Sequence, residues 1–131
     1  MTSATSSSSP FPSVLVTASG SYLPEKILTN DDLSQMMDTN DDWIRQRSGI
    51  TQRHIIADDQ LTSDMAVEAA RNALDMAGLS VDEIDGIIVA TTTPDDTFPS
   101  TAATVQRKLE AFHAFAFDIQ AVCAGFVYAL D

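Results

Sequence analysis

The chain contains 131 residues, of which 44% are hydrophobic and 20% are charged. This length and this balance are typical of one soluble globular domain with a modest core. Seven basic and nineteen acidic side chains give a formal net charge of −12, which disfavours nonspecific binding to nucleic acid or to an anionic membrane. The hydrophobic runs are shorter than the ~20 residues that a membrane-spanning helix needs, so we expect neither nucleic acid nor a membrane as a partner.

Cysteine and histidine are scarce in this sequence. The single cysteine, Cys123, cannot form an intramolecular disulfide, and with the two histidines it makes no CxxC or HExxH spacing. We therefore expect no metal site and a reducing, cytoplasmic location.

The first thirteen residues differ in composition from the rest. They are rich in Ser, Thr and Pro and carry no charged side chain. Such a segment cannot bury enough apolar surface to offset the entropy of ordering, so we expect a flexible tail over residues 1–13 and a folded region over residues 14–131. The tail lacks the apolar core of a signal peptide and the arginines of a transit peptide.

In chain order, the pattern first predicts a buried strand at residues 14–18. Asn30 or Asp31 can cap a short helix that follows. Met36 and Met37, near the end of that helix, are expected to fill core space. A second short helix is expected at residues 41–45.

The middle of the chain contains the clearest helical pattern. Gly49 is expected to stop the preceding helix, and residues 52–56 suit a strand. A long helix then begins at Thr62 or Ser63, either of which can cap it, and ends at Gly78. Its buried stripe is expected to consist of Ala66, Ala69, Ala70, Ala73, Leu74 and Ala77.

The last third of the chain alternates strands and helices. Residues 84–90 form a continuous apolar run, which is typical of a strand covered on both faces in a parallel sheet. Pro99 suits the first turn of a helix that extends to Leu109. A strand at residues 115–119 and a terminal helical stretch follow. This alternation predicts an α/β fold in which helices are layered on the sheet.

Cys123 lies where the last strand meets the terminal helical stretch. The unpaired N–H groups of a helix's first turn favour a thiolate, which makes Cys123 a candidate nucleophile. Ala121, Ala124 and Gly125 leave room beside it for a substrate carbonyl, and the N–H of Cys123 could help to bind an oxyanion. From the pattern alone an inert core cysteine stays open. The apolar stretch at residues 126–130 is expected to be buried inside something larger than these residues can build, so residues 1–131 alone should leave it uncovered.

Several motifs follow one another in a recognisable order. The last is FDIQAVCAGFVYAL at residues 117–130. The earlier ones are GSYLPE at 20–25, TN at 29–30, DT at 38–39, WI at 43–44, RSGI at 47–50, RHI at 53–55, ATTT at 90–93 and FPS at 98–100. Together they resemble the front part of β-ketoacyl-acyl carrier protein synthase III, a thiolase-fold condensing enzyme. The resemblance implies that residues 14–131 form the N-terminal half of a thiolase-like fold, with layered helices and a mixed β-sheet.

The resemblance implies an acyltransferase that initiates fatty acid synthesis. Cys123 would accept the acyl group of acetyl-CoA or another short acyl-CoA, and malonyl-acyl carrier protein would lose carbon dioxide and attack the acyl-cysteine. No cofactor is implied, because acyl-CoA is a substrate. The family's catalytic His and Asn lie beyond residue 131, so residues 1–131 alone are expected to be inactive, and the complete enzyme is expected to be a homodimer.

The resemblance also implies contacts to CoA. Trp43 and Arg47 are four residues apart and therefore share a face of a helix. Trp43 matches the family's residue that stacks on the CoA adenine, and Thr39 and Arg47 match residues along the CoA path. Arg45 and Arg53 could add positive potential near the phosphates. From the residues alone, a half-buried Trp that anchors its helix stays open.

Phe98 resembles the residue that walls the acyl pocket across the family's dimer interface and limits chain length. A Phe ahead of a helix can equally be a hydrophobic staple. His54 and His113 match no catalytic residue of the family, so both are expected to be structural or solvated.

Two alternatives to the implied function stay open. A related acyltransferase or condensing enzyme of secondary metabolism would use the same cysteine for a different reaction. A noncatalytic truncated relative would keep Cys123 buried and inert.

Overall fold

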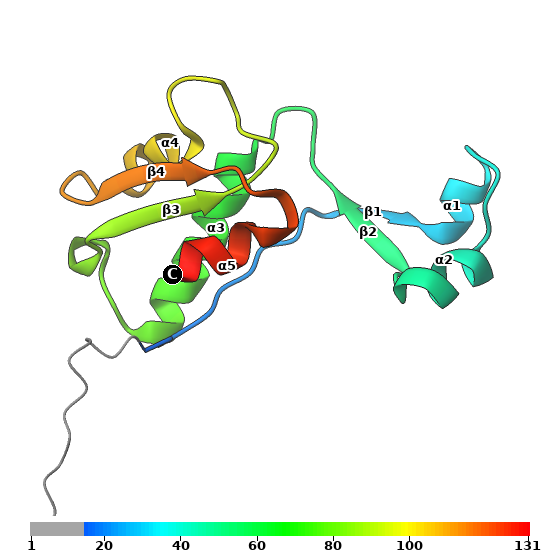
Figure 1. Ribbon diagram of the computed structural model, residues 1–131, viewed down its shortest axis with the longest axis horizontal. Helices are drawn as coiled ribbons and strands as arrows, with labels where there is room; N and C mark the ends of the chain where they lie inside the picture. The colour runs from blue at the N-terminus through cyan, green and yellow to red at the C-terminus, as the bar shows by residue number, and fades with distance from the viewer. Residues whose placement is uncertain (1–14) are drawn as a thin grey trace, which may run out of the picture.

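The computed structural model describes residues 15–131, which form a layered α/β body and a projecting arm (Figure 1). The elements are, in order, β1 (Lys26–Thr29), α1 (Asn30–Ser34), α2 (Asp41–Ser48), β2 (Gln52–Ile55), α3 (Thr62–Ala77), the 3-10 turn η1 (Val81–Glu83), β3 (Gly86–Ala90), α4 (Thr101–Leu109), β4 (Phe115–Ile119), the 3-10 turn η2 (Val122–Ala124) and α5 (Gly125–Leu130). The predicted tail at residues 1–13 and Val14 lie outside the described residues.

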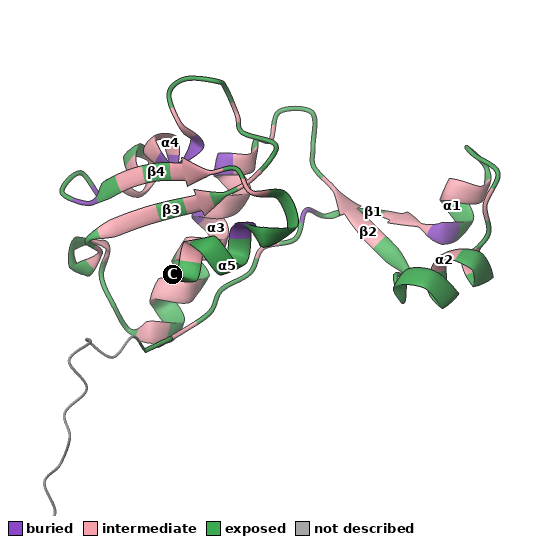
Figure 2. Cartoon of the chain, in the orientation of Figure 1, coloured by how far each residue is buried: buried purple, intermediate pink, exposed green. Residues whose placement is uncertain are grey.

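The body is built on a parallel pair of strands. β3 and β4 are in register from Gly86 opposite Phe115 to Ala90 opposite Ile119. In Figure 1, α3 and α4 lie behind these strands and α5 lies in front of them. The buried apolar side chains gather around α3 and α4 (Figure 2), and they are Val67, Ala102, Val105, Ala111 and Ala114. The strands are therefore covered by helices on both sides, as an α/β layer requires.

The arm consists of the antiparallel strands β1 and β2 with α1 and α2 at their far end (Figure 1). Lys26 pairs with Ile55 at one end of the ladder, and Thr29 pairs with Gln52 at the other. Its buried residue at the tip is polar: the Asn30 side chain is 1% exposed. The described residues thus contain one parallel and one antiparallel strand pair.

Several sequence predictions are confirmed. β2, β3, β4 and the long helix α3 lie where the pattern places them. Gly49 and Gly78 follow α2 and α3 with φ values of 72° and 68°. This left-handed conformation is accessible to glycine at little cost, which explains why both helices end there. β1 was not predicted, and its short sequence KILT carries no strong strand pattern.

The strand predicted at residues 14–18 is wrong for its described part. Leu15 and Val16 are 78% and 75% exposed and lie outside any strand. A strand needs a neighbour that pairs with its backbone, whereas this segment runs beside α3. Gly20 approaches α3 so closely that a Cβ atom there would overlap the backbone of Ala69 and Ala73.

The predicted helix starts need correction. Thr29, not Asn30 or Asp31, caps α1: its hydroxyl accepts from the Asp32 N–H at 3.1 Å, and the Asp32 carboxylate accepts from the Thr29 N–H at 2.9 Å. This reciprocal pair is a capping box. It frees Asn30 to turn inward.

The two later helices also start differently from the prediction. Leu61 is the cap residue of α3, with the Asp64 carboxylate accepting from its N–H at 2.9 Å. Ser100 caps α4 through the Ala103 N–H at 3.2 Å, so Pro99 precedes the cap instead of lying in the first turn. In each case the side chain that satisfies the free N–H groups decides the boundary.

Predicted burial is wrong at several apolar positions. Met36 and Met37 are exposed, because α1 ends at Ser34, before them. In α3 the fully buried residues are Ser63 and Val67, and the predicted alanine stripe is only partly covered. By contrast, the exposure of α5, where Phe126 is 71% exposed, agrees with the expectation that these residues cannot cover the last helix by themselves. Within residues 15–131, no helix has both the length and the apolar character needed to cross a bilayer.

Two carboxylates fasten the helices of the body to their neighbours. Asp118 on β4 accepts from the N–H groups of Thr101 and Ala102 at 2.8 and 2.7 Å, so each oxygen serves one free donor at the start of α4. Asp95, in the loop before α4, accepts from the N–H of Ser63 at 2.9 Å and holds the loop against the start of α3.

Replacing Asp118 should weaken the body. Asp118→Asn leaves one acceptor oxygen for two helix donors and removes the charge, so we expect the free energy of unfolding to fall by about 1–3 kcal/mol. Denaturant unfolding of the natural protein measures this. Asp96→Asn, on the exposed part of the same loop, is the control and should change stability by no more than about 0.5 kcal/mol. Equal effects of the two variants would contradict the capping role.

Lys108 links α4 to α3. Its Nζ donates to Ser63 Oγ at 2.6 Å and to Asp64 Oδ1 at 2.5 Å. The pKa of Asp64 is lowered below its ordinary value of 3.8, first by the hydrogen bond from Lys108 and then by the N–H of Leu61. A pKa that is lower in the folded than in the unfolded chain adds stability above the unfolded value, and that stability is lost as the pH falls through the folded value.

Acid stability should therefore depend on Asp64. We expect Asp64→Asn to flatten the loss of unfolding free energy as the pH falls below 3.8, the ordinary pKa of this carboxyl. Denaturant titrations over a pH series measure the slope. In a Lys108→Gln background the same substitution should change the slope less, and an unchanged difference would show that Lys108 is not the cause.

Candidate functional site

Cys123 lies on the turn that joins β4 to α5, and its side chain is exposed among the described residues. The sequence predicts Cys123 in the first turn of an α-helix, whereas the structure places it in the 3-10 turn η2, before α5 begins at Gly125. The Ala124 N–H donates to the Ala121 carbonyl at 2.9 Å, so the chain winds more tightly here than an α-helix does. The thiol therefore precedes the helix instead of belonging to it.

The turn around Cys123 is strained and closely packed. Val122 has a φ of 48°, a left-handed conformation that is unusual for a β-branched residue. Gly125 is buried, and a Cβ atom there would lie 3.2 Å from the Cβ of Ala90 on β3. The small residue lets α5 approach the strand, and the strained turn sets the exit of the chain from β4. Backbone strain of this kind is concentrated at functional turns.

A cavity opens at the same edge of the sheet. It is lined by Thr91, Pro94, Asp96, Thr97, Ser100, Asp118 and Gln120, from the ends of β3 and β4 and the loop before α4. The same loop carries Phe98, which is 88% exposed. A hydrophobic staple would pack against α4, so that prediction for Phe98 is wrong. Its predicted place at an acyl pocket stays a prediction.

The structure brings Trp43 and Arg47 together on α2. The Arg47 guanidinium carbon lies 4.3 Å from the centre of the indole ring, which is a cation–π contact. The predicted common helix face is confirmed. Trp43 is 52% exposed, so its ring keeps accessible surface beside the guanidinium. Thr39 is half-buried just before Asn40, whose side chain caps α2 through the Trp43 N–H at 2.8 Å.

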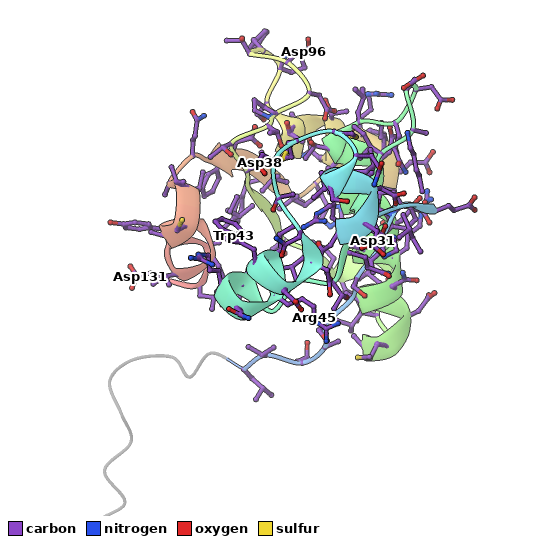
Figure 3. All side chains as sticks on the ribbon, turned by 90° about the vertical axis from the view of Figure 1, so that its right-hand side faces the viewer. Asp31, Asp38, Trp43, Arg45, Asp96 and Asp131 are labelled. Atoms are coloured by element: carbon purple, nitrogen blue, oxygen red, sulfur yellow. The ribbon has the colours of Figure 1, made fainter. Side chains whose placement is uncertain are left out.

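The other arginines of the arm are occupied by acids or amides. Arg45 lies 3.7 Å from the Asp41 carboxylate, and Arg53 donates to Asn30 Oδ1 at 2.8 Å. Arg53 is therefore committed to the inside of the arm, which weakens its predicted phosphate role. Figure 3 looks at the arm end-on, with Trp43 and Arg45 on α2 nearest the viewer.

The histidines follow the prediction. His54 on β2 is half-buried, and its Nδ1 lies 2.5 Å from the Pro24 carbonyl oxygen, which makes it structural. His113 is exposed in the turn before β4. Within the described residues, no group of three or more His, Cys, Asp or Glu side chains is placed to hold a metal ion.

Two separate places therefore carry the candidate chemistry. Cys123 lies on the body beside the sheet edge, and the Trp43–Arg47 pair lies on α2 at the far end of the arm (Figure 1). Sequence reasoning missed the residue that organises the arm tip, Asn30, because Asn before Asp-Asp is a usual capping pattern. A buried amide has no sequence signal that separates it from a cap.

Comparison with known proteins gives one consistent result. The chain is 58% identical over 115 residues to the β-ketoacyl-[acyl-carrier-protein] synthase III of Wolbachia pipientis wMel, covering 88% of this chain and 36% of that protein. It is 62% identical over 117 residues to the enzyme of the same name from Ehrlichia canis (strain Jake), covering 89% of this chain and 37% of that protein. This chain is similar to part of β-ketoacyl-[acyl-carrier-protein] synthase III. No family model matches the sequence.

Solved structures support the likeness to synthase III. The 3-oxoacyl-[acyl-carrier-protein] synthase III from Aquifex aeolicus VF5 matches with a TM-score of 0.82 and 50% identity, covering 88% of this chain and 37% of that one. The priming β-ketosynthase of the R1128 polyketide pathway matches with a TM-score of 0.83 and 36% identity, covering 88% and 34%. These matches confirm the predicted resemblance and the thiolase-like α/β fold. The chain spans little more than a third of the length of these relatives.

The exposure of Cys123 leads to a direct prediction. We expect iodoacetamide to modify Cys123 in the native natural protein before the protein unfolds, because the thiol is exposed on its turn among the described residues. Peptide mass mapping after timed quenching measures this, and Cys123→Ser identifies the modified peptide. Protection of the thiol until the protein unfolds would favour an inert, buried cysteine.

Proposed function

We propose that the natural protein containing this sequence is an initiating 3-oxoacyl-[acyl carrier protein] synthase, an acyltransferase of fatty acid synthesis. One observation carries the proposal: the exposed thiol of Cys123 lies on a strained strand-to-helix turn, within a chain that is about three-fifths identical to synthases of this name. The proposed substrates are a short acyl-CoA and malonyl-acyl carrier protein.

In the first stage, the Cys123 thiolate attacks the carbonyl carbon of the acyl-CoA thioester. A new C–S bond forms, the bond to the CoA sulfur breaks, and CoA leaves as a thiolate. Exchange between two thioesters of similar energy needs no cofactor. A thiolate is the side-chain nucleophile best suited to receive an acyl group from another thiol.

In the second stage, malonyl-acyl carrier protein loses carbon dioxide. The electron pair of the broken C–C bond forms a new C–C bond with the acyl carbon, and Cys123 leaves as a thiolate. Negative charge develops on the malonyl thioester oxygen on the way, so this stage needs hydrogen-bond donors aimed at that oxygen. We propose that a His and an Asn outside residues 15–131 supply them.

The chemistry of the two candidate places suits CoA as the acyl donor. CoA carries an adenine nucleotide at one end and its thiol at the other, and we propose that one molecule contacts both α2 and Cys123. The half-exposed indole of Trp43 suits stacking with adenine, while Arg47 and Thr39 suit the phosphate-bearing part. We further propose a homodimer in the cytoplasm, with the exposed Phe98 lining the partner's acyl pocket.

Acylation of Cys123 tests the proposal. Incubating the natural protein with acetyl-CoA should add one acetyl group, measured by intact mass, and Cys123→Ser should abolish it. Addition of malonyl-acyl carrier protein should then remove the adduct and yield a 3-oxoacyl product. Absence of any adduct with acetyl-CoA, a branched short acyl-CoA and a long acyl-CoA would overturn the proposal.

A second function is favoured by the match to the priming β-ketosynthase. Its TM-score of 0.83 is as high as the 0.82 of the synthase III from Aquifex aeolicus VF5. A condensing enzyme of secondary metabolism would form the same acyl-cysteine but use another second substrate. An adduct that persists when malonyl-acyl carrier protein is added would favour this alternative.

A further inference from the structure

The helix α2 presents a problem of support. None of its residues is buried, and its neighbour among the described elements is the short helix α1. Apolar packing among the described residues therefore gives α2 little support, with Ile44 only half-buried, although the orientation of α2 decides where the Trp43–Arg47 pair points. Something else must fix the ends of α2.

One side chain contacts both ends of α2. The Asn30 Nδ2 donates to Asp41 Oδ1 at 2.7 Å and to the Ile50 carbonyl at 2.8 Å. Asp41 is the first residue of α2, and Ile50 is the second residue after its end. The same amide accepts from Arg53 Nη1 at 2.8 Å, which ties it to β2.

Burial makes these contacts matter. Asn30 is 1% exposed, so each N–H and the carbonyl oxygen would be left without water if its partner were lost. Figure 2 shows this buried residue at the start of α1, between the strand pair and α2. The amide therefore has one low-energy arrangement, in which both ends of α2 are held at once.

We propose that Asn30 is a positioning residue that orients the Trp43–Arg47 pair for the adenine nucleotide of the acyl-CoA. This inference rests on the proposed function, since it needs CoA to bind at α2. Asn30 itself does not touch the ligand. It fixes the positions of the Trp43 indole and the Arg47 guanidinium before CoA binds. Less conformational entropy is then lost on binding.

Asn30→Asp is the sharpest substitution. The two side chains have the same shape, and a carboxylate can still accept from Arg53. It has no N–H for Asp41 or Ile50, however, and it places negative charge against the Asp41 carboxylate. Asn72→Asp is the matched control, because Asn72 is an exposed amide on α3 that donates to the Ser21 carbonyl at 2.8 Å.

The expected result is a change in affinity without a change in chemistry. In the natural protein, Asn30→Asp should raise the KM for acetyl-CoA by about tenfold or more, since two buried hydrogen bonds are lost. The kcat at saturating acetyl-CoA and the acetyl adduct on Cys123 should stay close to wild type. Asn72→Asp should leave both KM and kcat unchanged.

Trp43 provides an independent spectroscopic measurement. Its emission, identified by subtraction of a Trp43→Phe variant, should shift to longer wavelength and become more accessible to a soluble quencher in Asn30→Asp. This signal needs no ligand. A purely structural defect elsewhere in the body would leave Trp43 unaffected.

Two further variants distinguish the loss of these hydrogen bonds from misfolding of the Asn30→Asp protein. Asp41→Ala, at a half-buried position, removes the hydrogen bond from Asn30 to Asp41 but keeps the one to the Ile50 carbonyl. It should therefore raise the KM less than Asn30→Asp does. The double variant Asn30→Asp with Asp41→Asn restores a hydrogen bond with donor and acceptor exchanged, and it should recover part of the affinity. Recovery by a second substitution cannot come from a misfolded protein.

The outcomes separate the two proposals. If wild type forms the acetyl adduct but Asn30→Asp and Asp41→Ala keep the wild-type KM and the wild-type Trp43 emission, the positioning role is overturned and the proposed function stands. If Asn30→Asp lowers kcat and KM stays the same, Asn30 acts elsewhere and the inference is again overturned. If wild type forms no adduct and CoA does not perturb Trp43, both proposals fall.

Discussion

The parallel pairing of β3 with β4 is the constraint on which the body depends. Parallel strands end at the same edge of a sheet, so the segments that follow them must begin side by side. After β3 comes the loop that carries Phe98, and after β4 comes the turn that carries Cys123. One pairing therefore places an exposed thiol and an exposed aromatic ring at one edge, although 24 residues separate β3 from β4. Sites at the carboxyl edge of parallel strands are a general feature of α/β proteins.

The two parts of the chain are held together by different physics. In the body, Val67, Ala102 and Val105 are buried between helices, and carboxylates such as Asp118 cap the helix starts against the sheet. In the arm, the residue buried at the tip is the amide Asn30. Its hydrogen bonds, instead of apolar contacts, hold the elements of the tip together. Hydrogen bonds are directional, so such a tip can hold a helix in one orientation while leaving its outer surface free for a ligand.

The large apolar side chains outside the core are unevenly placed. Leu15 and Val16, in the segment before β1, and the large apolar side chains of α5 are exposed among the described residues. An apolar helix exposed in this way is costly in water. The relatives are nearly three times as long as the match, so a covering segment in the natural protein is consistent with the proposed function.

The sequence by itself determined most elements of the body. Alanines at helical spacing, the Gly78 stop and the apolar run before Ala90 are local patterns, and local patterns decide helices and buried strands. Cys123 was recognised because its neighbours are small and because the surrounding motif resembles one family. The i,i+4 spacing of Trp43 and Arg47 predicted their contact for the same local reason.

Only the tertiary structure decided the features that depend on distant partners. Residues 15–18 look like a strand but have no strand to pair with, and Thr29 took the cap that Asn30 could have made. The turn at Val122 places Cys123 ahead of its helix, which no propensity predicts for a β-branched residue. Asn30 became the support of α2 because folding brought Asp41, Ile50 and Arg53 to one buried amide from three places in the chain. A hydrogen bond across such separations depends on the whole backbone path, and that information is not present in any local stretch of sequence.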